Sequence, residues 1–100
     1  MWWSEDPALG RRPVLILSRH AVLETLRRPL VAPLTTRIRG LPTEVQLDAD
    51  DGLPQPCAVS LDNVQPLAAA LLVDRIARLD PERMRAVCDA LAFAVECDAG

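Results

Sequence analysis

Residues 10–18, GRRPVLILS, contain the strongest strand signal in the chain. Their centre, residues 13–17, is a continuous apolar run bounded by proline and serine, a pattern typical of a buried β-strand. A second strand is predicted over residues 30–36, where Pro33 favours an edge or a bulge. Arg12 precedes the first buried run directly, so we expect its guanidinium to stand at the mouth of a rigid strand.

The rest of the chain indicates short strands, turns and helices. Residues 43–47 alternate strictly between apolar and polar, which predicts a half-buried strand. Met1-Trp2-Trp3 has the character of the end of a strand whose beginning is missing, followed by a loop from Ser4 to Gly10. Further short strands are expected at 58–61, 63–67 and 73–79.

Two helices are expected, one of them at the C-terminal end. Ser18 is an acceptable N-cap for a short helix that Pro29 would end. Asp80-Pro81-Glu82 is a strong helix start, and apolar residues recur at helical spacing from there to about Cys97. The sum predicts a β-rich α+β fold, in which a small, curled, mostly antiparallel sheet packs against one helix.

Composition restricts the class of protein. The chain has 100 residues, of which 50% are hydrophobic and 25% charged, as in one small globular domain. The longest apolar run, residues 67–73, is too short to span a bilayer, and no signal-peptide pattern is present, so we expect a cytoplasmic protein without a membrane role. The three cysteines, Cys57, Cys88 and Cys97, show no CxxC spacing, which favours reduced, buried thiols over a disulfide or a zinc site.

The net charge of −3 conceals two blocks of opposite sign. Residues 10–40 contain seven arginines and one acidic residue, whereas residues 41–74 contain six acidic residues and no basic one. A basic segment can bind phosphates even in an acidic protein. The alternative is that the two blocks pair with each other on the surface.

Three stretches carry residues suited to chemistry. A guanidinium at Arg12 can clamp a phosphate and oppose the charge of a phosphoryl-transfer transition state. Residues 31–45, VAPLTTRIRGLPTEV, place two hydroxyls at a strand end before a loop with arginines, and residues 60–64 form a polar corner. Each stretch taken alone favours a structural role, with Thr35 as a β-former, Arg12 as a solvated charge and Asp62 as a turn former. His20 stands alone, and no spacing supports its pairing with a cysteine nucleophile or a metal ion.

The stretches together resemble the MazF/PemK family of type II toxin–antitoxin ribonucleases. The resemblance extends from Trp2 to Cys97 and rests on GRRPVLILS, on VAPLTTRIRGLPTEVQL (31–47), on AVSLDNVQPL (58–67) and on RIARLDPERM (75–84). It implies an SH3-like barrel of twisted antiparallel strands with short helices and a C-terminal helix, working as a homodimer.

The resemblance also implies an activity. It is cleavage of single-stranded mRNA at a short sequence without a metal ion or other cofactor, which leaves a 2′,3′-cyclic phosphate and a 5′-hydroxyl and inhibits translation and growth. The partner would be an antitoxin with an acidic, disordered tail. By the same resemblance the catalytic residues would be Arg12 and Thr35, and the RNA-binding residues Arg11, Thr36, Arg37 and Arg39.

The N-terminal end departs from the family's pattern. Members usually begin with a strand that carries Arg-Gly before an aromatic pair, and here the chain starts at the pair, so we expect one domain over residues 1–100 with a truncated first strand. The following loop lacks the Gly-Ser-Glu-Gln element of many members. Two alternatives therefore stay open: a degenerate member that binds antitoxin or RNA without cutting, and a small-barrel interaction module without a nucleic-acid role.

Overall fold

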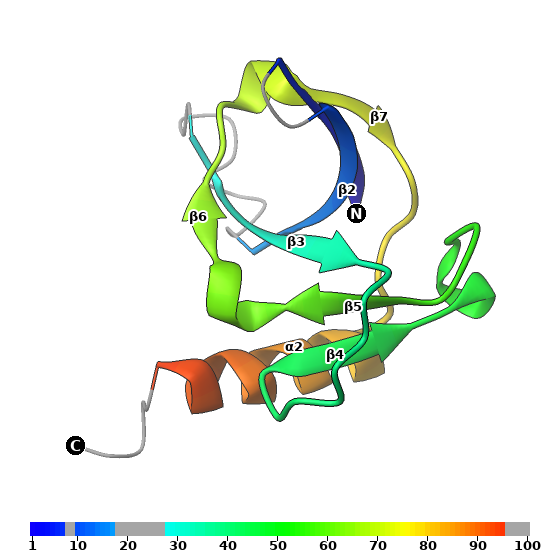
Figure 1. The fold of residues 1–100 in the computed structure, drawn as a ribbon, viewed down its shortest axis with the longest axis vertical. Helices are drawn as coiled ribbons and strands as arrows, with labels where there is room; N and C mark the ends of the chain where they lie inside the picture. Colours follow the sequence, from blue (N-terminus) through cyan, green and yellow to red (C-terminus); the bar gives the residue numbers. More distant parts are fainter. Residues whose placement is uncertain (8–9, 18–27, 96–100) are drawn as a thin grey trace.

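The fold is a curved antiparallel sheet with a helix along its lower edge (Figure 1). A computed structural model describes residues 1–7, 10–17 and 28–95. In this part of the chain, seven strands form one sheet in the order β4-β5-β3-β2-β1-β7, with β6 paired to β3. The strands are β1 (Trp2–Asp6), β2 (Gly10–Ile16), β3 (Leu30–Thr35), β4 (Glu44–Leu47), β5 (Cys57–Ser60), β6 (Gln65–Pro66) and β7 (Leu72–Arg75). The remaining elements of the described residues are three 3-10 turns and one α-helix: η1 (Ala49–Asp51), η2 (Leu61–Asn63), η3 (Ala69–Leu71) and α2 (Pro81–Ala94).

This arrangement confirms the predicted fold class. Every strand pair is antiparallel, and the sheet curls around its apolar face, as expected for an SH3-like barrel. No helix in the described ranges is long and apolar enough to cross a membrane.

Strand β3 joins the two halves of the sheet. Its residues Val31 to Pro33 pair with β2, while Leu34 and Thr35 pair with β5. Strand β6 pairs with the first residues of β3. The turn η2 therefore connects β5 to β6, two strands that both pair with β3. Pro33 therefore lies in a central strand rather than at an edge, at the break between its two paired segments, where a residue without an N–H donor is tolerated.

Several strand boundaries differ from those predicted. Strand β1 continues to Asp6 instead of ending at Trp3, because Ser4 to Asp6 pair with Arg12 to Gly10. The strand expected at 63–67 is reduced to Gln65–Pro66, since the residues before it form η2. The strand expected at 73–79 ends at Arg75. The helix predicted from Ser18 lies outside the described residues.

The N-terminal residues are integrated into the sheet. Strand β1 pairs with β2 along its whole length and with β7 over Trp2 to Ser4. Met1 is buried, its amine donates a hydrogen bond of 2.7 Å to the Ala77 carbonyl, and its carbonyl accepts one of 2.9 Å from Ile76.

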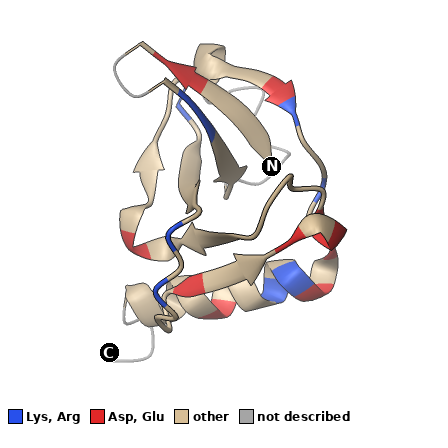
Figure 2. Cartoon of the chain, turned by 45° about the vertical axis from the view of Figure 1, so that its right-hand side comes forward, with Lys and Arg blue, Asp and Glu red and all other residues tan. Residues whose placement is uncertain are grey.

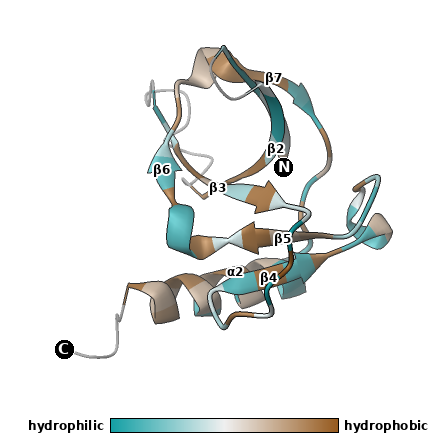
Figure 3. Cartoon of the chain, viewed as in Figure 1, coloured by the Kyte–Doolittle hydropathy of each residue, from teal (hydrophilic) through white to brown (hydrophobic). Residues whose placement is uncertain are grey.

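Helix α2 begins as its sequence predicts. The Asp80 carboxylate accepts a hydrogen bond of 2.8 Å from the Arg83 backbone, and Pro81 occupies the first turn. The Arg83 side chain also pairs with the Asp51 carboxylate at 3.3 Å, which fixes the helix to η1. The buried face of α2 packs against β4 and η2, below the apolar segments of β3 and β5 (Figure 3).

The cysteines follow the prediction only in part. Cys57 is a free, buried thiol in β5. Cys88 is free but exposed, so the expectation of burial was wrong there, because it lies on the outer face of α2. Cys97 lies outside the described residues.

The core between sheet and helix gives a stability prediction. Leu47 on β4 is 2% exposed and belongs to the cluster that includes Val87 of the helix. We expect Leu47→Ala to lower the free energy of unfolding by about 2–5 kcal/mol, measured by urea denaturation, because it leaves a cavity. Phe93→Ala is the control, since Phe93 is 62% exposed on the same helix. Equal losses in both variants would contradict this description of the core.

Candidate functional site

The site lies where strands β2 and β3 separate. Their pairing ends at Val14 opposite Pro33, and beyond this point β2 continues along β1 while β3 continues along β5. Side chains two residues apart share a face of a strand. The next pair on the face of Val14 and Pro33 would be Arg12 and Thr35, which therefore flank the opening instead of closing a ladder. We call this opening the fork.

One cavity lies on that face of the fork. It has a volume of about 360 Å³ and is lined by both Arg12 and Thr35. We call it the Glu44 cavity, after the carboxylate in its wall. Its other polar lining residues are Ser4, Asp6, Arg39, Ser60, Asn63 and Gln65.

A second cavity of about 340 Å³ shares a wall with the first. Arg12, Leu34 and Thr35 line both. We call it the Trp3 cavity. It is lined further by Trp3, Arg11, Pro13, Thr36, Leu53, Pro54, Gln55 and Cys57.

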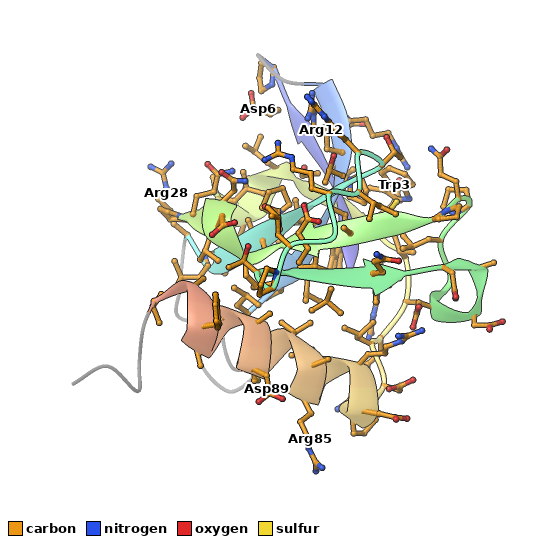
Figure 4. All side chains as sticks on the ribbon, turned by 60° about the horizontal axis from the view of Figure 1, so that its bottom comes forward. Trp3, Asp6, Arg12, Arg28, Arg85 and Asp89 are labelled. Carbon is orange, nitrogen blue, oxygen red and sulfur yellow. The ribbon has the colours of Figure 1, made fainter. Side chains whose placement is uncertain are left out.

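Arg12 is held at the fork by its backbone. The buried Ser4 hydroxyl donates a hydrogen bond of 3.0 Å to the Arg12 carbonyl from the neighbouring strand. The side chain is exposed and lies at the end of the molecule that also carries Trp3 and Asp6, opposite Arg85 and Asp89 of α2 (Figure 4). A strand thus holds the base of the arginine, while its charged end reaches solvent.

Thr35 is oriented by the loop that follows it. Its hydroxyl oxygen accepts a hydrogen bond of 3.1 Å from the Arg37 backbone N–H. A hydroxyl has one proton to donate, and an acceptor bond on its oxygen leaves that proton available. Thr35 can therefore donate to an anion that enters the fork.

Glu44 fixes the arginine-bearing loop. One carboxylate oxygen accepts hydrogen bonds from the backbone of Arg39, at 2.9 Å, and of Leu41, at 3.5 Å. The Glu44 backbone N–H also donates to the Leu41 carbonyl at 3.0 Å. The sequence interpretation assigned Glu44 no role. Its signal was an acidic residue in the alternating strand immediately after the arginine loop.

The polar corner of residues 60–64 supports the same side of the site. Asn63 donates a side-chain hydrogen bond of 2.8 Å to the Ser60 hydroxyl, and both residues line the Glu44 cavity. The Thr43 hydroxyl donates to the Asp62 carboxylate, which joins this corner to the start of β4. The corner thus forms one wall of the cavity.

Arg11 is held by two carboxylates and an aromatic ring. It pairs with Glu5 at 3.1 Å and with Asp74 at 3.0 Å, and its guanidinium lies over the Trp3 ring at 5.0 Å from the centroid. These acidic neighbours, chiefly the hydrogen bond with Asp74, raise the pKa of Arg11. In Figure 2 the acidic residues of β1 lie beside the basic residues of β2.

The alternative that the two charge blocks neutralise each other holds for Arg11 but not for the loop. Among residues 1–7, 10–17 and 28–95, no carboxylate pairs with the guanidinium groups of Arg37 and Arg39. Both are exposed. Two exposed guanidinium groups without a carboxylate partner among the described residues thus remain on the loop beside the fork.

The predicted site residues are divided between the two cavities. Arg12 and Thr35 line both, Arg39 lines the Glu44 cavity, and Arg11 and Thr36 line the Trp3 cavity. Arg37 lines neither cavity, although its backbone orients Thr35.

The thiol and metal alternatives gain no support. Burial raises the pKa of the Cys57 thiol, which disfavours the thiolate that nucleophilic catalysis needs. His20 lies outside the described residues. Within the described ranges, no three His, Cys, Asp or Glu side chains form a group that could hold a metal ion.

The chain is similar in sequence to known toxins. The sequence profile of the PemK-like, MazF-like toxin of type II toxin–antitoxin systems matches residues 4–95. The chain is 52% identical to the probable endoribonuclease MazF5 of Mycobacterium tuberculosis, over 97% of this chain and 90% of that protein.

Solved structures give the same result. The Mycobacterium tuberculosis toxin MazF-mt6 superposes with a TM-score of 0.87 at 38% identity, over 96% of this chain and 97% of that one. A mycobacterial endoribonuclease in complex with its cognate antitoxin superposes with a TM-score of 0.84 at 29% identity, over 95% and 89% of the two chains.

The loop anchored by Glu44 generates a prediction. Glu44→Ala removes the acceptor for two backbone N–H groups, so we expect the amides of Arg39 and Leu41 to exchange hydrogen for deuterium faster, as measured by NMR. Glu44→Gln keeps an acceptor oxygen and should retain most of the protection. Unchanged exchange in Glu44→Ala would show that the carboxylate does not hold the loop.

Proposed function

The chain belongs to the PemK/MazF family of type II toxins and is an endoribonuclease of a toxin–antitoxin system, and from this premise we propose how it cuts RNA. The substrate is single-stranded RNA, mainly mRNA, cut at a short sequence in the cytoplasm. The scissile phosphate lies at the fork, between Arg12 and Thr35. The observation that carries the proposal is that these two side chains, 23 positions apart in sequence, line the same cavities.

The reaction is an internal transesterification. The ribose 2′-oxygen loses its proton and bonds to phosphorus, while the bond from phosphorus to the 5′-oxygen breaks and that oxygen gains a proton. The products are a 2′,3′-cyclic phosphate and a 5′-hydroxyl. The nucleophile belongs to the RNA, so the protein needs neither a metal-bound water nor a cysteine thiolate.

Arg12 stabilises the negative charge that develops on the phosphate oxygens in the transition state. A guanidinium stays protonated through the physiological range and offers a planar set of donors to phosphate oxygens. The hydrogen bond from Ser4 fixes the backbone from which these donors extend, which limits the reorganisation that catalysis requires.

Thr35 orients the same phosphate. The Thr35 oxygen accepts a hydrogen bond from the Arg37 backbone N–H, and this bond leaves the hydroxyl proton available for donation. The side chain donates to a non-bridging oxygen and fixes the phosphorus against the attacking 2′-oxygen.

The remaining arginines bind the strand around the cut. Arg39 in the Glu44 cavity and the exposed Arg37 meet the RNA backbone, with Arg11 and Thr36 on the other side of the shared wall. Binding should therefore weaken as salt is added.

Partners follow from the same family membership. A solved relative forms a complex with its cognate antitoxin, which supports an antitoxin partner for this chain too. We propose that an acidic, disordered antitoxin tail covers the basic surface at the fork, and that the toxin acts as a homodimer that inhibits translation and growth when free.

Removal of the guanidinium tests the catalytic assignment. We expect Arg12→Ala to lower kcat/KM for cleavage of a single-stranded RNA by about 10²–10³-fold, because it deletes a preorganised donor to the transition state. The assay contains excess EDTA, in which the wild type should cut at full rate. Arg85→Ala, at an exposed arginine on α2, is the matched control.

Three outcomes are informative. Undiminished cutting by Arg12→Ala removes this residue from the mechanism. Loss of wild-type activity in EDTA contradicts the metal-independent reaction. RNA binding by the wild type without any cleavage identifies a degenerate toxin instead of an active enzyme.

A further inference from the structure

The two cavities lie on opposite faces of the sheet. Arg12 and Val14 of β2 line the Glu44 cavity, whereas Arg11 and Pro13, the residues between them, line the Trp3 cavity. Alternate residues of a strand point to opposite faces. The cavities meet only at the fork, so an RNA strand with its phosphate there has a flanking nucleotide beside each of them.

The Trp3 cavity has a flat, rigid wall. The Arg11 guanidinium lies on the Trp3 ring, and two carboxylates, Glu5 and Asp74, hold its two terminal nitrogens. With its charge already paired, this guanidinium is better suited to stacking than to clamping a phosphate. Arginine planes and aromatic rings are surfaces on which single-stranded RNA stacks its bases.

Gln55 supplies a polar group in the same cavity. It is exposed, and its side-chain amide makes no hydrogen bond to another described residue. Its backbone is restrained by prolines on both sides and by the Cys57 thiol, which donates to the Gln55 carbonyl at 3.4 Å. A restrained amide with donors and an acceptor can read the edge of a base.

The size of the cavity fits one base. Its volume of about 340 Å³ falls at the lower end of the range for small-molecule sites, roughly 300–1,000 Å³. The lining combines apolar residues, Leu34 and Leu53, with the few polar groups described above.

We propose that the Trp3 cavity is a nucleobase subsite, in which one base next to the scissile phosphate stacks on the Arg11–Trp3 pair and is selected by the Gln55 amide. This inference rests on the proposed function, because it takes the phosphate to lie between Arg12 and Thr35. It assigns part of the enzyme's sequence preference to a residue outside the arginine loop.

Mapping of cut sites on a random-sequence single-stranded RNA tests the subsite. The wild type should prefer particular bases at the positions beside the cut. In Gln55→Ala, the ratio of cutting at preferred and disfavoured bases should fall by about 5- to 150-fold at one of those positions, the range expected for one good amide–base pair. The preferences at the other positions should remain. Gln46→Ala removes an exposed glutamine on β4 and should leave every preference unchanged. An unaltered preference in Gln55→Ala overturns the proposal.

A binding experiment tests the nucleobase subsite independently of RNA cleavage. The four nucleoside monophosphates are titrated into the wild type and Gln55→Ala, and backbone amide shifts are followed by NMR. We expect at least one nucleotide to shift the amides of Arg11, Leu53, Gln55 and Cys57 in the wild type and to bind at least about 5-fold more weakly to Gln55→Ala. Absence of shifts at these residues overturns the subsite. Such shifts without RNA cleavage would support it and count against the proposed function alone.

Discussion

The point at which β2 and β3 stop pairing determines the rest of this structure. Val14 opposite Pro33 is their last pair, and each strand then follows a different neighbour. Because of this divergence, the next two side chains on the same side of the sheet, Arg12 and Thr35, flank an opening instead of lying next to each other on paired strands. Two cavities adjoin there, and both residues line each of them. A sheet that curls around a small core thus leaves an opening at its own point of separation, and this opening is where we propose that the phosphate binds.

The arginines around the opening differ in their carboxylate partners. Arg11 pairs with two nearby carboxylates, and its guanidinium lies over an aromatic ring. The arginines of the loop after β3 lack such partners among the described residues, and Glu44 uses its carboxylate on the loop's backbone instead of on their guanidinium groups. The carboxylate therefore shapes the loop without pairing with its side chains. The Glu44 cavity thus presents Arg12 and Arg39 on one face of the sheet, and the Trp3 cavity presents the Arg11–Trp3 pair on the other.

Much of this could be predicted from the sequence. The apolar run at 13–17 and the Asp80-Pro81 helix start are local signals, and the structure confirms both. The extension of β1 to Asp6 and the shortening of β6 could not be foreseen, because both depend on pairing with distant strands. The juxtaposition of Arg12 and Thr35 was available only through the resemblance to the MazF/PemK family. The contacts of Glu44 with the loop, and the role that we propose for Gln55, depend on loop geometry, which residue type and position in the sequence do not determine.

A double-mutant cycle of Arg12→Ala and Thr35→Val, measured as kcat/KM for RNA cleavage, tests the central claim most directly. If both side chains contact one phosphate, the double variant should lose less than the sum of the two single losses, with a coupling free energy of about 0.5–3 kcal/mol. Strictly additive losses would mean that the two residues act at separate places, and the fork would then not be the catalytic site.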